Sequence, residues 1–265
     1  MSKENTAVTK KKIKRCKEDV VFDAACFIIL TLVLFVVAYP LYWVIISSIS
    51  APSAVSSGKV LLHPIGFTLK GYAEVFKNDQ VMRGFLNSLI ITFCGVMVNL
   101  IVTLPTSYAL SRSNFSGKKP ITIFYLITMF FGGGLIPTYL VIQRLQMLNT
   151  IWALILPGCL SVYNMIVART FFKSNISEEL YEAAEIDGCT QARFFFQIAL
   201  PLSKAIIAIL VLYYGVGHWN SYFSALVYIS DKAKYPLQLV LRNILITNQT
   251  ALSQTCLLYT SPSPR

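Results

Sequence analysis

The chain has 265 residues, of which 55% are hydrophobic and 13% are charged, whereas an ordinary soluble domain has roughly 25% charged residues. A mean hydropathy of +0.61 excludes a disordered chain and disfavours a water-soluble globule, because so much apolar surface is costly in water. The net charge of +11 lies in short basic clusters between long apolar runs, which membrane topology explains better than nucleic-acid binding does. The composition therefore predicts an integral membrane protein.

Long, continuous apolar runs predict a polytopic, all-α membrane protein. A helix rises about 1.5 Å per residue, so about 20 mainly apolar residues are needed to cross a hydrocarbon core of about 30 Å. Helices are favoured over a barrel because the runs do not alternate between polar and apolar residues. Five segments are long enough to span the membrane: Val21–Ile46, Phe85–Leu110, Ile121–Ile142, Ile151–Phe172 and Ala205–Ile229.

The basic residues predict the orientation of these spans. Segment 1–20 is expected to be a cytoplasmic N-terminus, because cytoplasmic loops carry an excess of Lys and Arg; its basic residues are Lys3, Lys10, Lys11, Lys12, Lys14, Arg15 and Lys17. Alternation then places the loop with Arg112, Lys118 and Lys119 inside, loop 143–150 outside, and loop 173–204 inside. The transmembrane domain is expected over residues 21–246.

Two other segments have a predicted local structure. The stretch Ser47–Gly84 contains two prolines and several glycines, so its first half should be irregular, with a short amphipathic helix near Tyr72–Phe76. In the third span, Gly132, Gly133 and Gly134 precede Pro137; they favour close helix packing, with a proline kink or a hinge as the alternative. No nucleotide-binding, metal-binding or catalytic motif is found in the sequence, so no cofactor, metal or enzymatic activity is predicted.

The loop between the fourth and fifth predicted spans is rich in acidic residues, namely Glu178, Glu179, Glu182, Glu185 and Asp187. Ser177 can cap a helix whose first turn is acidic, and Gly188 can end that helix in the left-handed conformation. Thr190 can cap a second helix. The aromatic run Phe194–Phe196 is expected to bury itself against the bundle or against a partner. The loop therefore predicts two short helices joined by a turn.

These residues resemble the EAA motif of permease subunits of binding-protein-dependent ABC importers. The match comprises Glu182-Ala183-Ala184, then Gly188, then Ile198-Ala199-Leu200-Pro201, at the family's spacing. The resemblance implies a type I ABC importer permease core of the MetI-like fold, in which this loop docks in a groove of a cytoplasmic ATPase and transmits its closure. The implied ATPase-coupling residues are Glu182, Ala183, Ala184, Asp187, Gly188, Ile198, Leu200 and Pro201.

The resemblance extends over approximately Tyr39 to Ile246. The strings GGGLIPTYLVIQRLQMLNTIWALILPG, RTFFKSNISEELYEAAEIDG and GHWNSYFSALVYI are similar to carbohydrate-importer permeases, nearest the branch for polysaccharide or oligosaccharide uptake. It implies sugar import across a bacterial cytoplasmic membrane by alternating access. It also implies partners: a second homologous permease, an ABC ATPase dimer in which ATP is hydrolysed, and an extracellular substrate-binding lipoprotein.

The C-terminal segment departs from the family pattern. The family core has six spans, whereas TNQTALSQTCLLYTSPSPR after Ile246 is too short and too polar for a sixth helix. We therefore expect five spans present, the sixth missing, and residues 247–265 to be a truncated or artefactual tail.

A polar and aromatic group interrupts the fifth predicted span. Trp219, Asn220 and Tyr222 form a candidate substrate path, because aromatic faces suit sugar C–H surfaces and an amide suits hydroxyls; interfacial anchoring by Trp219 is the alternative. A second function, an ion-coupled secondary transporter or a channel, is disfavoured because few ionisable groups lie in the middle of the spans.

Overall fold

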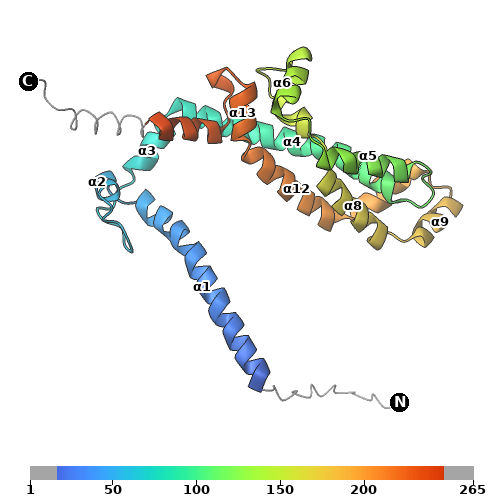
Figure 1. Cartoon of the computed structure of the whole chain (residues 1–265), viewed down its shortest axis with the longest axis horizontal. Helices are drawn as coiled ribbons and strands as arrows, with labels where there is room; N and C mark the ends of the chain where they lie inside the picture. Colours follow the sequence, from blue (N-terminus) through green and yellow to red (C-terminus); the bar gives the residue numbers. More distant parts are fainter. Residues whose placement is uncertain (1–16, 248–265) are drawn as a thin grey trace, which may run out of the picture. The chain divides into compact units, whose positions relative to one another are not determined.

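The computed structural model describes residues 17–247 and contains only helices, turns and irregular segments over that range. The all-α prediction is confirmed. The chain forms two compact units, residues 1–77 and 78–265, which are described separately (Figure 1). The basic N-terminal residues 3–15 and residues 248–265 of the predicted tail lie outside the described range.

The first unit contains α1 (Lys17–Ser48), α2 (Pro52–Ser56) and α3 (Lys70–Lys77). The apolar side chains of α1 are exposed along most of its length, and its Val21–Ser48 portion is long and apolar enough to cross a membrane. The irregular segment after α1 is tied to it, because the indole nitrogen of Trp43 donates a 2.8 Å hydrogen bond to the carbonyl of Val60. The helix α3 confirms the predicted short helix near residues 72–76.

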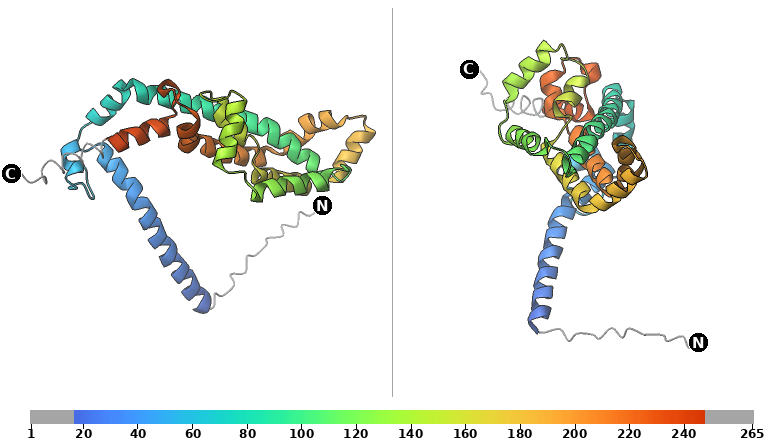
Figure 2. Two further views of the ribbon diagram at one scale, coloured as in Figure 1. Left: turned by 45° about the horizontal axis from the view of Figure 1, so that its top comes forward. Right: turned by 90° about the vertical axis from the view of Figure 1, so that its right-hand side faces the viewer.

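The second unit is organised around α4 (Asp79–Ser111), which packs against α8 (Val162–Asn175) and α12 (Lys204–Trp219). Figure 2 shows α12 running alongside this long helix. Polar side chains lie on its buried face: Ser88, Asn99, Thr103, Ser107 and Ser111. One of them, Thr103, makes a 2.7 Å hydrogen bond with the hydroxyl of Tyr214 in α12. This hydrogen bond satisfies two hydroxyl groups that lipid could not.

The third and fourth predicted spans are bent rather than continuous, and a further bend lies at Ser203, just before the fifth. Helix α5 (Lys118–Phe130) meets α6 (Leu135–Arg144) at 113°, and α7 (Trp152–Ile155) with η1 (Leu156–Gly158) meets α8 at 53°. The segment before α12 meets it at 80°. This segment consists of α10 (Gln191–Phe194), the π-helical η2 (Phe195–Ala199) and α11 (Leu200–Leu202). By length and composition, two single helices of the described range could span a membrane, or five if each bent pair counts as one span.

The glycine run in the third predicted span is a bend and not a packing surface. Gly132 and Gly134 have no atom within 4 Å of where a Cβ would lie, and the nearest to Gly133 is Pro137 Cβ at 3.8 Å. Gly134 has φ of +83° and immediately precedes α6. Within this chain the glycines do not serve the expected close packing, and Gly134 instead takes a backbone conformation that favours glycine.

The fifth predicted span ends earlier than expected. Helix α12 stops at Trp219, and the chain continues through α13 (Tyr222–Tyr228), η3 (Lys232–Lys234) and a final helix, Leu237–Thr247. The amide of Asn220 donates to the carbonyl of Val216 at 2.9 Å, so it caps the end of α12. The predicted continuous helix to Ile229 was wrong because this capping residue ends it. The final helix was not predicted.

Candidate coupling loop and substrate path

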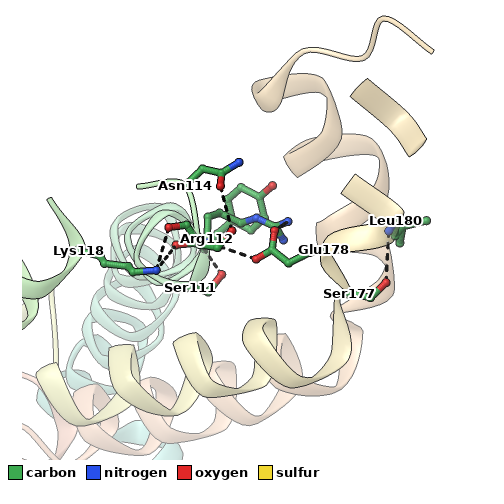
Figure 3. Close-up of polar contacts among 9 residues, drawn as sticks. Ser111, Arg112, Asn114, Lys118, Ser177, Glu178 and Leu180 are labelled. Carbon is green, nitrogen blue, oxygen red and sulfur yellow. Dashed lines mark hydrogen bonds and ion pairs between the residues drawn. The ribbon is translucent and has the colours of Figure 1, made fainter. Parts of the chain in front are cut away.

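The acidic loop folds into α9 (Glu178–Ile186) followed by α10. The hydroxyl of Ser177 accepts a hydrogen bond from the amide of Leu180 at 3.3 Å, and Thr190 Oγ1 accepts one from the amide of Arg193 at 3.4 Å (Figure 3 draws the first). Gly188 has φ of +75°. The two predicted caps and the predicted left-handed glycine are therefore confirmed. Each is a local interaction that ends or begins a helix.

The two faces of α9 differ in burial. Tyr181 is buried and Ala184 packs partly against the hydrophobic core. The opposite face is exposed and comprises Glu182, Ala183, Glu185, Ile186 and Asp187. Ile186 is 87% exposed, which is costly for a large apolar side chain in water. The outward face of α9 is thus acidic with one apolar side chain at its end.

Most side chains singled out in the second half of the loop pack against the chain's own core. Phe194 and Phe195 are buried against the bundle, whereas Phe196 is 65% exposed. For this third ring, burial against the bundle is excluded, and burial against a partner stays a prediction. The π-helical turn from Phe195 shifts the side-chain register, and successive residues of a helix point in different directions. Of the remaining motif residues, Ile198 and Leu200 pack partly against the core, whereas Pro201 is exposed.

An arginine that directly follows α4 joins that helix to α9. Arg112 Nη2 lies 2.9 Å from Glu178 Oε2, and the other carboxylate oxygen accepts a 3.2 Å hydrogen bond from the backbone amide of Ser113 (Figure 3). The ammonium group of Lys118 donates to the carbonyls of Arg112 and Ser113 at 3.2 and 2.9 Å. The first residue of α9 is therefore bonded to both side chain and backbone at the end of α4.

The guanidinium group of Arg112 also lies over three aromatic rings. Its carbon is 4.8 Å from the ring centroid of Tyr181, 5.6 Å from that of Tyr108 and 5.9 Å from that of Phe194. These distances suit cation–π attraction, which strengthens when the cation is partly removed from water. The arginine side chain is only 13% exposed. One cation thus contacts α4, α9 and α10 together.

A cavity of about 350 Å³ adjoins this cluster. Its lining is mainly aromatic and apolar, with Arg112 and Glu178 at its polar side; the other lining residues are Pro105, Tyr108, Ala109, Asn114, Phe115, Tyr181, Gln191, Ala192, Phe195 and Phe196. The exposed ring of Phe196 belongs to this lining.

The candidate path residues lie elsewhere in the same unit, at the end of α12 and the start of α13 (Figure 1). Trp219 meets Phe85 edge to face, with ring centroids 6.0 Å apart. The amide oxygen of Asn220 accepts a long, 3.5 Å hydrogen bond from Gln238. Tyr222 is 43% exposed. The structure therefore places Trp219 against the first part of α4, and none of these three residues lines the cavity beside the acidic loop.

Sequence reasoning missed the residues that join the loop to the bundle. Arg112 was interpreted only as a topology signal, and Tyr108 and Tyr181 were not singled out. One local signal was present: Tyr108 lies four residues before Arg112, the spacing at which helical side chains meet.

No family model matches the chain. Among curated proteins, the chain is 37% identical over 227 residues to the polygalacturonan/rhamnogalacturonan transport system permease protein YtcP of Bacillus subtilis, covering 86% of this chain and 79% of that protein. It is 39% identical over 226 residues to the protein LplC of the same organism, covering 85% and 76%. A solved bacterial ABC transporter involved in import of the acidic polysaccharide alginate has a chain that superposes with a TM-score of 0.81 at 28% identity, covering 86% of this chain and 81% of that one.

The helical architecture and these similarities define a membrane-embedded ABC importer permease. The chain belongs to the permease subunits of carbohydrate ABC importers. Its relatives are transporter subunits and not enzymes themselves.

Proposed function

We propose that this permease moves a polysaccharide-derived oligosaccharide inward by alternating access, driven by a separate ATPase that docks on α9. The observation that carries the proposal is the exposed face of α9, which ends at a left-handed Gly188 with no atom within 4 Å of a Cβ there. Open space around the turn leaves room for a partner surface, and the outward acids give that surface a defined charge. The EAA spacing supports the ATPase as the partner.

The proposed assembly contains a second homologous permease, an ATPase dimer and an extracellular substrate-binding lipoprotein. The N-terminus is proposed to be cytoplasmic, because the basic cluster of residues 3–17 obeys the positive-inside bias. The residues proposed to contact the ATPase directly are the exposed motif residues of α9 and the turn after it, namely Glu182, Ala183, Asp187 and Gly188. Ile198 and Leu200 act through packing behind them, since both lie against the core.

The test of docking uses two substitutions on the exposed side of the loop. Ala183→Trp places a bulky ring on the outward face, and Gly188→Val places a β-branched residue at φ of +75°, a conformation that costs such a residue about 1–2 kcal/mol. Both should reduce co-purification of the ATPase and abolish sugar uptake. Gly158→Val is the control, because Gly158 also has open space around it but no positive φ.

Wild-type uptake and wild-type ATPase binding in both variants would reject the docking role of α9. Ala184→Trp should affect folding, unlike the two variants above, because Ala184 packs against the chain's own core. That substitution should lower the amount of folded permease as well as ATPase binding.

The substrate class is tested by competition. The relatives' names include polygalacturonan and galactooligosaccharide permeases, and the solved structure concerns alginate. Uptake of labelled oligogalacturonides by the assembled transporter should be inhibited most strongly by acidic oligosaccharides. Stronger inhibition by galacto-oligosaccharides or diacetylchitobiose would assign a neutral sugar instead, and failure of all of them would reject an oligosaccharide substrate.

A further inference from the structure

The contacts of Arg112 are unusual for a residue at the cytoplasmic end of a long helix. Such side chains normally extend into solvent, and an exposed ion pair contributes little. Here the arginine side chain is 13% exposed, its Glu178 partner 45% exposed, and the guanidinium carbon lies within 6 Å of three ring centroids. The site therefore holds one planar cation between two elements that are 66 residues apart in the chain.

On the α9 side, the carboxylate of Glu178 completes this contact between α9 and the end of α4, which we call the Arg112 joint. One oxygen is bound to the arginine, and the other accepts the backbone amide of Ser113. Because Glu178 is the first residue of α9, its negative charge is also favoured at the positive end of the helix dipole. The first turn of α9 is consequently held at two points to the end of α4.

The joint leads directly to the other candidate site. Helix α4 has 33 residues, which corresponds to a length of about 50 Å. Near its beginning, Phe85 contacts Trp219 edge to face, and Ser88 Oγ accepts a hydrogen bond from the amide of Leu237 at 2.8 Å. One helix therefore connects the acidic loop with the residues proposed to line the substrate path.

We propose that Arg112 is a positioning residue for energy coupling: it locks the first turn of α9 to α4, so that displacement of α9 by its partner moves α4. The proposal rests on the proposed function, since only a docked α9 would be displaced. It requires an arginine in particular, because a planar guanidinium can lie over aromatic rings while it donates to a carboxylate, whereas the compact ammonium of lysine does not stack in this way.

The joint is separable from the fold. Tyr181 and Phe194 pack against each other with centroids 5.2 Å apart, and Tyr108 lies against Phe172 and Phe195 at 5.7 and 5.0 Å. These buried rings hold α9 and α10 on the bundle without the arginine. Replacing Arg112 should therefore leave an assembled transporter in which α9 is attached by apolar contacts alone, which resist sliding less than directional bonds do.

The experiment measures coupling in the assembled transporter, with its companion permease, ATPase and binding protein, in proteoliposomes. The readout is the number of oligogalacturonide molecules taken up per ATP hydrolysed. Arg112→Ala and Arg112→Lys should each lower this ratio about fivefold or more, the scale of a typical coupling between sites, with unchanged co-purification of the ATPase. Lys119→Ala is the control, because Lys119 is a nearby exposed cation in the first turn of α5.

A second variant tests the partner. Glu178→Gln should lower the ratio to a similar extent, and combining it with Arg112→Ala should lower it no further, as expected for two groups of one interaction. A wild-type ratio in Arg112→Lys, or a fall in the amount of assembled transporter with an unchanged ratio, would overturn the coupling role.

Comparing the α9 variants with Arg112→Ala shows whether this inference or the proposed function fails. If Gly188→Val uncouples the transporter while Arg112→Ala behaves as wild type, α9 docks but Arg112 does not position it, and only the inference fails. If Gly188→Val and Ala183→Trp both leave uptake and ATPase binding at wild-type levels, the docking role of α9 itself fails. If oligogalacturonides are not transported, the ratio is measured with the sugar selected by the competition assay.

Discussion

The two ends of the unit formed by residues 78–247 are held together differently. At the end that carries α9, aromatic rings are buried around the largely covered cation of Arg112. At the end where α4 begins, short hydrogen bonds from Asn87 and to Ser88 hold the backbone, but the three candidate path residues are loosely held. Trp219 makes one edge contact, Tyr222 is 43% exposed, and the hydrogen bond to Asn220 is 3.5 Å long. Dense, directional contacts suit transmission of movement, and sparse contacts suit a surface that rearranges around a ligand.

The largest effect should come from the packed end. Phe194 is fully buried, so Phe194→Ala removes a ring from the cluster around Arg112. By analogy with soluble cores, the free energy of unfolding should fall by about 3–5 kcal/mol, measured by denaturant titration of the permease in detergent micelles. Phe196→Ala, at a ring that is 65% exposed, should change it by less than about 0.5 kcal/mol. Equal losses in the two variants would contradict the comparison.

A smaller effect should come from a tight contact between α4 and α12. A Cβ on Gly95 would lie 2.5 Å from Nε2 of His218, so in Gly95→Ala the imidazole of His218 must move out of its place between the two helices. Overpacking of this kind costs about 1–3 kcal/mol, whereas Gly217→Ala, with nothing within 4 Å, should be neutral or stabilising because alanine favours helix.

Thermal unfolding in detergent micelles measures the stability of both variants. Lower stability of Gly95→Ala than of Gly217→Ala would show that this end depends on one close helix contact. The reverse order would show that α12 adjusts freely and that the contact is not needed.

The smallest effect on stability is expected at the three candidate path residues, where cysteine labelling tests exposure to water directly. Single cysteines at Trp219, Asn220 and Tyr222, on a background without other cysteines, should react with a water-soluble thiol reagent in at least one transport state. Leu239→Cys is the control and should stay unreactive, because Leu239 is fully buried on the neighbouring final helix. Absence of labelling at all three positions in every state would remove them from the substrate path.

Local chemistry was predictable from the sequence. The caps at Ser177 and Thr190 and the left-handed Gly188 were predicted and observed, because each depends on hydrogen bonds or backbone angles within a few residues. The extents of α1 and α4 were also close to the predictions, since long apolar runs are a strong signal. The short helix α3 was likewise recognised from its own residues.

Bends and partners were not predictable in this way. The hydropathy of the third predicted span is continuous through Gly132 and Gly134, although the chain turns there by 113°. Hydropathy reports how apolar each residue is and carries no information on the direction of the backbone. The sequence did not distinguish Phe196 from its buried neighbours, yet the π-helical turn leaves its ring exposed on the bundle. The final helix, Leu237–Thr247, was missed because it is too short to be recognised as a span.

The sequence by itself determined the class of protein, its helical character and the acidic, capped loop with the spacing of its motif. Only the tertiary structure decided which faces of that loop are buried and which cation holds it. Arg112 and Glu178 are 66 residues apart, so no local pattern pairs them. Their contact exists because α4, α9 and α10 pack around one aromatic cluster, and packing brings together residues that the order of the chain keeps apart.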